Sequence, residues 1–195
     1  MGALINFTLD PPTSGLMKEQ HSFVALTIGF NFWIPLWRDV LLALGMRSVS
    51  RQSIEHILTT STSSPVIMLG GAREAALIKH RHPHLILSDR KGIFKLALQH
   101  KVPLVPVFTF GELETFDEPK LVGFLSLFKR ITGIMPMAFW PPMPHRTPLN
   151  TYIGEPVDPN AYTSWEDLRE AFKSSLLNLY NEHYQKYNYA PILVQ

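Results

Sequence analysis

The sequence contains no cysteine, which excludes disulfide bonds and thiolate metal sites. Charged residues are scarce as well, at 17% of the chain, whereas about 25% is usual in soluble domains. The net charge of +2 is too small to indicate nucleic-acid binding. Because 46% of the residues are hydrophobic and 11% aromatic, we expect part of the surface to be covered by lipid or by a partner.

The chain also lacks the usual hydrophobic targeting segments. Its first residues have neither the basic start nor the apolar core of a signal peptide. The apolar run 23–37 is shorter than the roughly 20 residues that a spanning helix needs, and Pro35 interrupts it. It is therefore either a buried core segment or an interfacial one. Trp33 and Trp37 fit both interpretations, because tryptophan favours membrane boundaries as well as large cores.

What remains is typical of one domain of 195 residues. Ser50 is a good N-cap for a helix over 51–58, and residues 150–153 have the pattern of an edge strand. The last helix is the clearest, because Thr163 and Glu166 form a capping-box pattern in front of an apolar face. That face repeats at three- and four-residue spacing through Trp165, Leu168, Phe172, Leu176, Leu179 and His183.

Residues 66–112 carry the strongest pattern. Two continuous apolar runs, 66–69 and 104–110, flank a helical segment over 93–100. Such runs alternating with helices predict an α/β fold, with a mixed, largely parallel sheet and flanking helices. In these sheets ligands bind beyond the carboxyl ends of the strands. We therefore expect the polar corners that follow the two runs to lie at one edge of the sheet, with Glu74 and Glu112 on the same side.

The first corner, Gly70-Gly71-Ala72 with Glu74, joins the first apolar run to the next segment. Paired glycines permit positive φ and close approach to a ligand, or serve only a tight turn. The charge of Glu74 would be stabilised near a helix N-terminus. Glu112, in the second corner, is either a carboxylate at the same edge or a strand cap.

A basic turn, Arg90-Lys91-Gly92, opens the helix between the two runs, and Asp89 is placed to cap it. Helix N–H groups together with two cations form a phosphate site. Two adjacent basic residues at a helix start are, however, more often simply an exposed turn. We expect no metal site, because no pair of histidines spaced i, i+4 has a carboxylate nearby.

Three motifs in order, LGGAREA, DRKGIFKLAL and VPLVPVFTFGE, resemble the type-2 diacylglycerol acyltransferase family, which includes monoacylglycerol and wax-ester acyltransferases. The resemblance extends to residues 1–7, to residues 32–51 in a fungal-looking version, and to the IGEP block at 153–156. It implies a glycerolipid-acyltransferase-like fold. It also implies transfer of an acyl group from acyl-CoA to diacylglycerol, or alternatively to monoacylglycerol or a wax alcohol.

The resemblance further assigns the site and its partners. It places Gly70, Gly71, Ala72 and a supporting Glu74 near the reaction, and leaves Arg90, Lys91, Gly92 and Glu112 as substrate-binding candidates. Acyl-CoA is a co-substrate and no cofactor is expected. The expected partners are the lipid acceptor, a membrane surface and possible further copies of the chain, but not nucleic acid. The expected location is the endoplasmic reticulum membrane or the surface of lipid droplets.

Two departures from the family pattern accompany the resemblance. A Gly-Arg-Gly block that stands before IGEP in the family is missing. The membrane hairpin and the His-Pro-His-Gly motif of the family precede the block that matches residues 1–7. The candidate catalytic base of the family is a histidine of that motif, so the resemblance places it ahead of Met1 and leaves the catalytic residue of this chain unknown.

The histidines that are present do not replace this base. His82-Pro83-His84 is a poor substitute, because it follows the glycine corner and has the composition of a solvated basic loop. The other histidines, including His100, have no acidic residue at an orienting spacing. We therefore expect this chain by itself to have little activity, and a truncated, lipid- or partner-binding remnant is the alternative.

Overall fold

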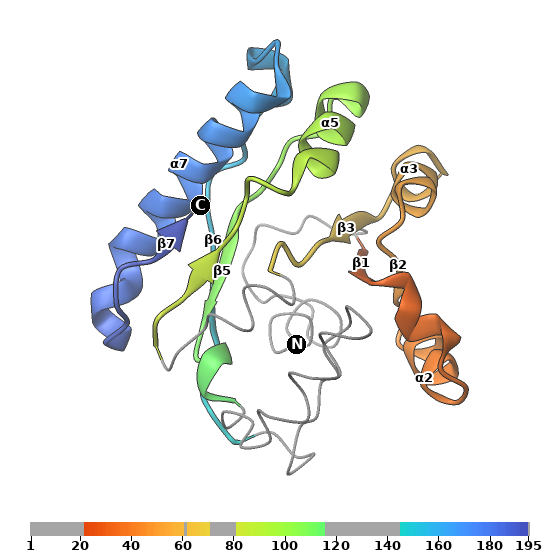
Figure 1. Ribbon diagram of the computed structural model, residues 1–195, viewed down its shortest axis with the longest axis horizontal. Coiled ribbons are helices and arrows are strands. Elements are labelled where there is room, and N and C mark those ends of the chain that lie inside the picture. Colours follow the sequence, from red (N-terminus) through yellow and green to blue (C-terminus); the bar gives the residue numbers. More distant parts are fainter. Residues whose placement is uncertain (1–21, 61, 71–80, 116–144, 195) are drawn as a thin grey trace.

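The computed structural model describes residues 22–60, 62–70, 81–115 and 145–194 (Figure 1). These residues form a mixed α/β arrangement of short strands and helices. The α-helices are α2 (Trp37–Ala43), α3 (Arg51–Thr60), α5 (Lys91–His100) and α7 (Trp165–His183). The strands are β1 (Phe23–Thr27), β2 (Arg47–Ser48), β3 (Ser64–Val66), β4 (His84–Leu85), β5 (Val107–Phe110), β6 (Asn150–Ile153) and β7 (Leu193–Val194). Single 3-10 turns are η1 (Gly29–Trp33), η2 (Glu112–Glu114), η3 (Pro159–Ala161) and η4 (Tyr184–Tyr187).

The strands belong to three small sheets rather than to one. β1 pairs in parallel with both β2 and β3, and β4 pairs in parallel with β7. β5 instead runs antiparallel to β6, with Val107 opposite Ile153 and Phe110 opposite Asn150. The predicted edge strand over 150–153 is thus confirmed. The expectation that the runs 66–69 and 104–110 share one parallel sheet is wrong in the described residues, because β3 and β5 lie in different sheets.

The main core lies where α7 packs on α5 and on β5 (Figure 1). Phe94 of α5 meets Phe172 of α7 edge to face, with ring centroids 5.8 Å apart. The predicted apolar face of α7 is confirmed for Leu168, Phe172 and Leu176, which are buried in this core. Burial of side chains of this size stabilises the folded state by roughly 1.5–3 kcal/mol each. The same packing fixes the amino-terminal ends of α5 and α7 next to each other.

An aromatic cluster joins the carboxyl end of α7 to β5. Phe110 and Tyr180 are fully buried, and Tyr187 stacks on Phe110 at a centroid distance of 4.6 Å. The Tyr180 hydroxyl donates to the carbonyl of Ala190 at 2.6 Å, which holds the chain after α7 against the cluster. These contacts position the end of β5, where one of the predicted corners lies.

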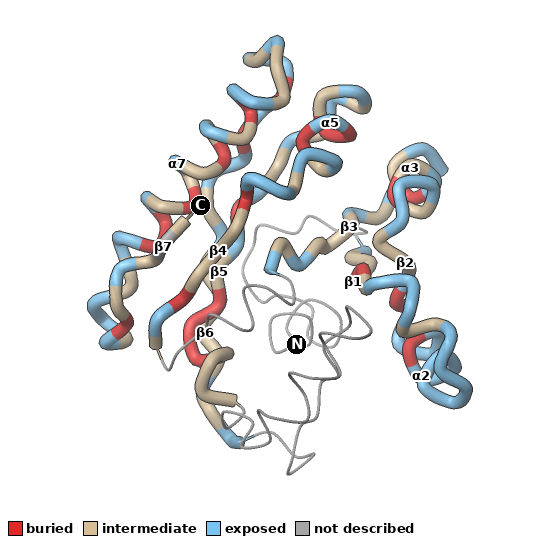
Figure 2. The backbone as a smooth tube through the Cα atoms, in the orientation of Figure 1, coloured by how far each residue is buried: buried red, intermediate tan, exposed pale blue. Residues whose placement is uncertain are grey.

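The other group of elements is built around β1. Its Leu26 packs with Ile54 and Ile57 of α3 and with Leu96 of α5, which connects the three-stranded sheet to the rest of the described structure. Beyond this cluster, Figure 2 shows α2 as a mostly exposed helix at the margin of the molecule. In the part of the chain that the structure describes, each helix falls short of the length and hydrophobicity needed to cross a bilayer.

Helix starts agree with the sequence prediction at one helix and differ at another. Ser50 caps α3 as predicted, since its hydroxyl accepts the Ser53 N–H at 3.4 Å. The cap of α7 is Ser164 rather than Thr163, and the Ser164 hydroxyl accepts the Asp167 N–H at 3.1 Å. The predicted capping box therefore lies one residue too early.

Candidate functional site

The glycine corner is only partly described. Gly71, Ala72 and Glu74 lie outside the described residues, so their predicted roles remain predictions. Gly70 is exposed, and a Cβ there would meet nothing within 4 Å. Its φ is not positive. The positive φ that paired glycines permit is therefore not used at Gly70.

The predicted position of the catalytic histidine, ahead of Met1, also remains a prediction. Met1 and the block 1–7 that resembles the segment after His-Pro-His-Gly lie outside the described residues. The candidate site in the described residues therefore contains no catalytic base positioned relative to the glycine corner.

The basic turn differs from the exposed turn that was the commoner expectation. Arg90 is the N-cap residue of α5, and its Nε is buried. Lys91 and Gly92 are exposed in the first turn of the helix. The N-cap position of α5 belongs to Arg90 rather than to the predicted Asp89, and the Arg90 side chain makes no capping hydrogen bond. Lys91 is thus more exposed than Arg90, which is half-buried.

Lys91 belongs to a group of three cations around one indole ring, which sequence reasoning missed. The Nζ atoms of Lys91 and Lys95 lie 5.7 and 5.5 Å from the Trp165 ring centroid. The guanidinium of Arg169, one turn along α7, lies 5.4 Å from the same centroid. Arg169 also pairs with Glu170 at 3.1 Å, so part of its charge is compensated. Spacing of four residues on each helix, Lys91 to Lys95 and Trp165 to Arg169, was the available signal.

The second corner is built tightly around Gly111. Gly111 has φ 94°, and a Cβ there would overlap the carbonyl of Pro148. Its N–H donates to the Tyr189 hydroxyl at 3.0 Å. Positive φ and close approach of backbone, which the sequence analysis associated with the glycines of the first corner, are thus both observed at Gly111. Glu112 follows as the first residue of η2 and is half-buried.

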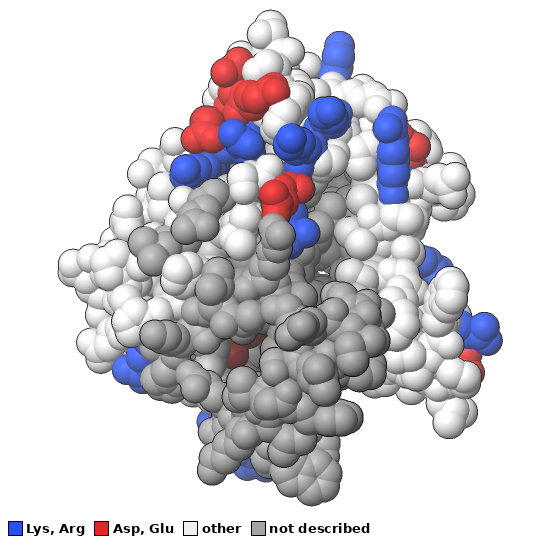
Figure 3. Space-filling view, viewed as in Figure 1, with Lys and Arg blue, Asp and Glu red and all other residues white. Residues whose placement is uncertain are grey.

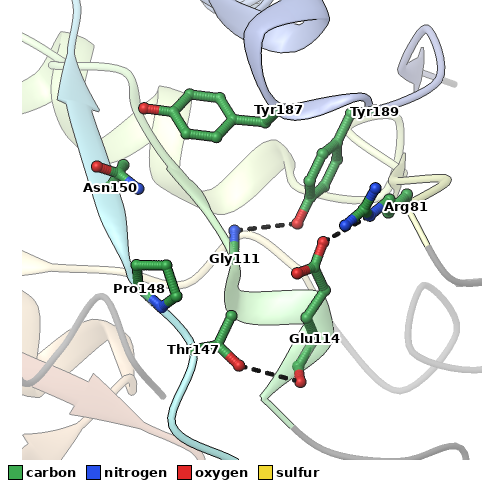
Figure 4. A pocket seen from close by; sticks show the side chains of 8 residues that line it. All are labelled: Arg81, Gly111, Glu114, Thr147, Pro148, Asn150, Tyr187 and Tyr189. Carbon is green, nitrogen blue, oxygen red and sulfur yellow. Dashed lines mark hydrogen bonds and ion pairs between the residues drawn. The ribbon is translucent and has the colours of Figure 1, made fainter.

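A cavity of about 120 Å³ adjoins this corner (Figure 4). Arg81 and Glu114 form an ion pair of 2.7 Å at its wall, and the two side chains are 39% and 22% exposed. Burial raises the pKa of Tyr189 above its ordinary value, against the smaller lowering effect of the hydrogen bond with the Gly111 N–H. Tyr189 is therefore neutral at physiological pH. The cavity is lined by Arg81, Gly111, Glu114, Thr147, Pro148, Asn150, Tyr187 and Tyr189.

This cavity is too small for a whole acyl-CoA, since pockets for drug-sized ligands measure roughly 300–1,000 Å³. The predicted binding residue Glu112 does not line it, whereas the neighbouring Gly111, which was not among the predicted site residues, does. Sequence reasoning missed Arg81, Glu114 and Tyr189. Glu114 stood only two residues beyond the predicted corner, whereas Arg81 was hidden in a run read as a solvated loop.

The run around His82-Pro83-His84 is not a solvated loop. Pro83 is buried, and His84 with Leu85 forms β4, paired with Leu193 and Val194. The loop prediction is wrong because a strand far along the chain covers this segment, a contact that local composition does not reveal.

One of the remaining histidines, His100, has an acidic neighbour that is distant in the sequence. The Nε2 atom of His100 is buried and lies 4.0 Å from a carboxylate oxygen of Glu55, across the seam between α3 and α5. Within the described residues, no group of three or more histidine, aspartate or glutamate side chains is arranged to hold a metal ion.

Comparison with known proteins gives a consistent result. The sequence profile of the diacylglycerol acyltransferase family matches residues 1–193. Diacylglycerol O-acyltransferase 2 of Dictyostelium discoideum is 34% identical over 94% of this chain and 62% of its own length. Diacylglycerol O-acyltransferase 1 of Schizosaccharomyces pombe is 35% identical over 81% of this chain and 50% of its own length. Human acyl-CoA wax alcohol acyltransferase 2 is 33% identical over 68% of this chain and 45% of its own length.

The chain thus spans about half the length of the curated relatives that it matches. No solved structure matches it. Because the family profile covers almost every residue and a relative above 30% identity covers most of the chain, the assignment does not depend on a single motif. The chain belongs to the diacylglycerol acyltransferase family.

Proposed function

We propose that the protein is an acyl-CoA-dependent O-acyltransferase of neutral lipid synthesis, which converts diacylglycerol to triacylglycerol. The observation that carries this proposal is the family match over residues 1–193. In the reaction the acceptor hydroxyl oxygen forms a bond to the acyl carbon, and the bond from that carbon to the sulfur of coenzyme A breaks. The hydroxyl proton leaves through a general base, and the thiolate of coenzyme A takes up a proton.

A monoacylglycerol or a wax alcohol is the second candidate acceptor. The relatives include proteins named acyl-CoA wax alcohol acyltransferase and human 2-acylglycerol O-acyltransferase 3, at 33% and 33% identity. Their identities to this chain are close to those of the diacylglycerol enzymes, so similarity alone does not rank the acceptors.

Within this function we assign roles to two predicted groups of residues. Gly70, Gly71, Ala72 and Glu74 lie near the reacting atoms, with Glu74 in a supporting role. The turn Arg90-Lys91-Gly92 contacts the phosphates of acyl-CoA, and the exposed position of Lys91 near Lys95 and Arg169 supports this assignment. Ammonium and guanidinium groups are the usual phosphate ligands of proteins.

The proposal extends to architecture and location. We take the chain as a single domain with a glycerolipid-acyltransferase-like fold, acting at the endoplasmic reticulum membrane or at lipid droplets. The alternative is a remnant that binds lipid or a partner and does not catalyse acyl transfer. The mixture of parallel and antiparallel strands with flanking helices is compatible with both.

The test measures product from labelled acyl-CoA in microsomes that lack other neutral lipid acyltransferases. The acceptors are diacylglycerol, 2-monoacylglycerol and a long-chain alcohol, supplied one at a time. The chain is assayed alone and fused behind the amino-terminal part of the Dictyostelium relative. Labelled triacylglycerol supports the main proposal, and wax ester supports the second acceptor. No product from any acceptor in either form contradicts both and leaves the non-catalytic alternative.

A further inference from the structure

Within the described residues, exposed hydrophobic side chains are concentrated in one segment. Nine of the thirteen large hydrophobic side chains exposed in the described residues fall between residues 28 and 44. Monomeric soluble proteins rarely expose contiguous apolar areas of this kind unless they bind something there. In Figure 3 the surface over α2 is mostly uncharged. We call these nine side chains the 28–44 patch: Ile28, Phe30, Trp33, Ile34, Leu36, Trp37, Val40, Leu42 and Leu44.

The fold holds the patch outward rather than leaving it loosely placed. In α2 only Leu41 is buried, and it anchors the helix in a small cluster with Ala25 and Met46. Trp37, Val40 and Leu44 follow at i, i+3 and i+7, which puts them on one side of the helix. All three remain exposed, so α2 presents an apolar stripe to solvent.

Leu36 adds a second, independent observation. Its φ is 65°, a left-handed conformation that is costly for a residue with a branched side chain, yet its side chain is 80% exposed. No packing interaction of that side chain explains why leucine stands where glycine would be unstrained. Backbone strain of this kind is concentrated at sites that bind something.

The polar groups of the segment indicate what the patch contacts. Asn31 donates to the Thr27 hydroxyl at 2.7 Å, and Arg38 pairs with Asp39 at 3.3 Å. Few polar side chains are therefore left in the segment for a protein partner, whose interface would need about one hydrogen bond per 100–200 Å². Hydrocarbon requires none. Two tryptophans among the nine residues match the preference of indole for the headgroup level of a bilayer.

An exposed cation follows the patch directly. Arg47 is exposed on β2 immediately after the segment, whereas Arg51 at the start of α3, although exposed, is paired with Glu55 at 2.8 Å. Cations next to an apolar segment are attracted to anionic headgroups while the apolar side chains enter the interface. We propose that the 28–44 patch is an in-plane membrane anchor that inserts into the interfacial layer of a bilayer containing anionic phospholipid.

This inference deepens the proposed function, because an enzyme that acylates diacylglycerol meets its acceptor in a lipid phase. It assigns the contact with the membrane to one segment and to one depth. The anchor lies in the interfacial layer and does not cross the bilayer. Its test needs no catalytic readout, so the two proposals fail separately. Vesicle binding without acyl transfer counts against the function alone, and acyl transfer without binding through the patch counts against the anchor alone.

The experiment is flotation of the full chain with phosphatidylcholine vesicles, with and without phosphatidylserine. The variants are Trp33→Ala and Leu36→Gly, and the matched control is Ile153→Ala, an exposed hydrophobic residue on β6. We expect the wild type to float, more so with phosphatidylserine, and each variant to lose about tenfold in partition coefficient. Ile153→Ala should float like the wild type.

Leu36→Gly separates binding from folding. Glycine adopts positive φ freely, so this variant should melt close to the wild type by circular dichroism even though it loses vesicle binding. A wild type that stays at the bottom of the gradient with both vesicles overturns the proposal, as do variants that float unchanged. It is also overturned if light scattering shows a dimer that Trp33→Ala dissociates while the vesicles bind no protein, since the patch would then face a second copy.

Discussion

Single residues decide the geometry of the corner after β5, and Gly111 is the most constrained of them. We expect Gly111→Ala to lower the free energy of unfolding by on the order of 2 kcal/mol or more, because alanine is strained at φ 94° and its Cβ would overlap the Pro148 carbonyl. Urea unfolding measures the change. Gly92→Ala is the control: its Cβ would enter open space in the first turn of α5, so stability should be unchanged or slightly raised. Equal losses in both variants would contradict the explanation.

At the same scale, Lys91 tests the phosphate role better than Arg90, whose Nε is buried. In an active form of the protein, Lys91→Ala should raise the KM for acyl-CoA roughly 2- to 5-fold, the usual worth of an exposed ionic contact, and leave kcat unchanged. Lys101→Gln removes the same charge from the other end of α5 and should change neither parameter. Steady-state kinetics at varied acyl-CoA provide both values. A fall in kcat with an unchanged KM would contradict the phosphate role.

At the scale of elements, the start of α7 separates two neighbouring candidates for a helix cap. Ser164→Ala should lower the free energy of unfolding by about 1 kcal/mol, because its hydroxyl accepts the Asp167 N–H. Thr163 is exposed and is not the cap residue, so Thr163→Ala should have little effect. Thermal or urea unfolding of the two variants checks the difference. The reverse order would restore the capping box predicted over Thr163 and Glu166.

Elements whose pattern is local could be predicted from the sequence, and those that depend on distant pairing could not. The apolar face of α7, the cap at Ser50 and the strand over 150–153 follow from spacing within a few residues, and the structure has them. The partner of β5 was predicted wrongly, because a continuous apolar run does not distinguish parallel from antiparallel neighbours. β4 was missed because its two residues become a strand only through pairing with β7.

In the candidate site, too, local features could be predicted from the sequence and distant contacts could not. Gly111 could be found from the break after an apolar run, since its cause lies in its own backbone. The Arg81–Glu114 pair and the cations around Trp165 bring together segments that lie far apart in the sequence. A single sequence does not show which distant side chains meet, and for that reason these groups had to come from the fold.

At the scale of the whole molecule, buried tyrosines tie stability to alkaline pH. Burial raises the pKa of Tyr180, and nearby Tyr189 and Tyr184 raise it further, while burial also raises the pKa of Tyr189. Tyrosine in the unfolded chain ionises near pH 10. Above about pH 10 the folded state therefore holds more protons, so the stability that is fully present below that pH is lost as the pH rises.

We expect the urea midpoint of the wild type to fall between about pH 10 and 11 more steeply than that of Tyr180→Phe. The variant lacks the Tyr180 hydroxyl, so its folded state retains one proton fewer in this pH range. Tyr180→Phe also loses the hydrogen bond to Ala190, so it should be less stable than the wild type at pH 7. Unfolding monitored by circular dichroism across the pH series gives both quantities. Parallel pH curves for the two proteins would show that another group causes the alkaline loss.

The pairing of β4 with β7 has a consequence for the order in which the protein acquires its structure during synthesis. His84 lies opposite Leu193, so β4 stays without its partner strand until the ribosome has made the residues of β7. β1, β2 and β3, in contrast, are all complete by Val66. At the usual elongation rate of about 5–20 residues per second, the stretch between these two events takes roughly 6–25 seconds. Once residues 84–110 have been made, the nascent chain carries an unpaired β4 edge and a Phe110 without Tyr180 and Tyr189 beside it, which are features that favour aggregation until the last residues are added.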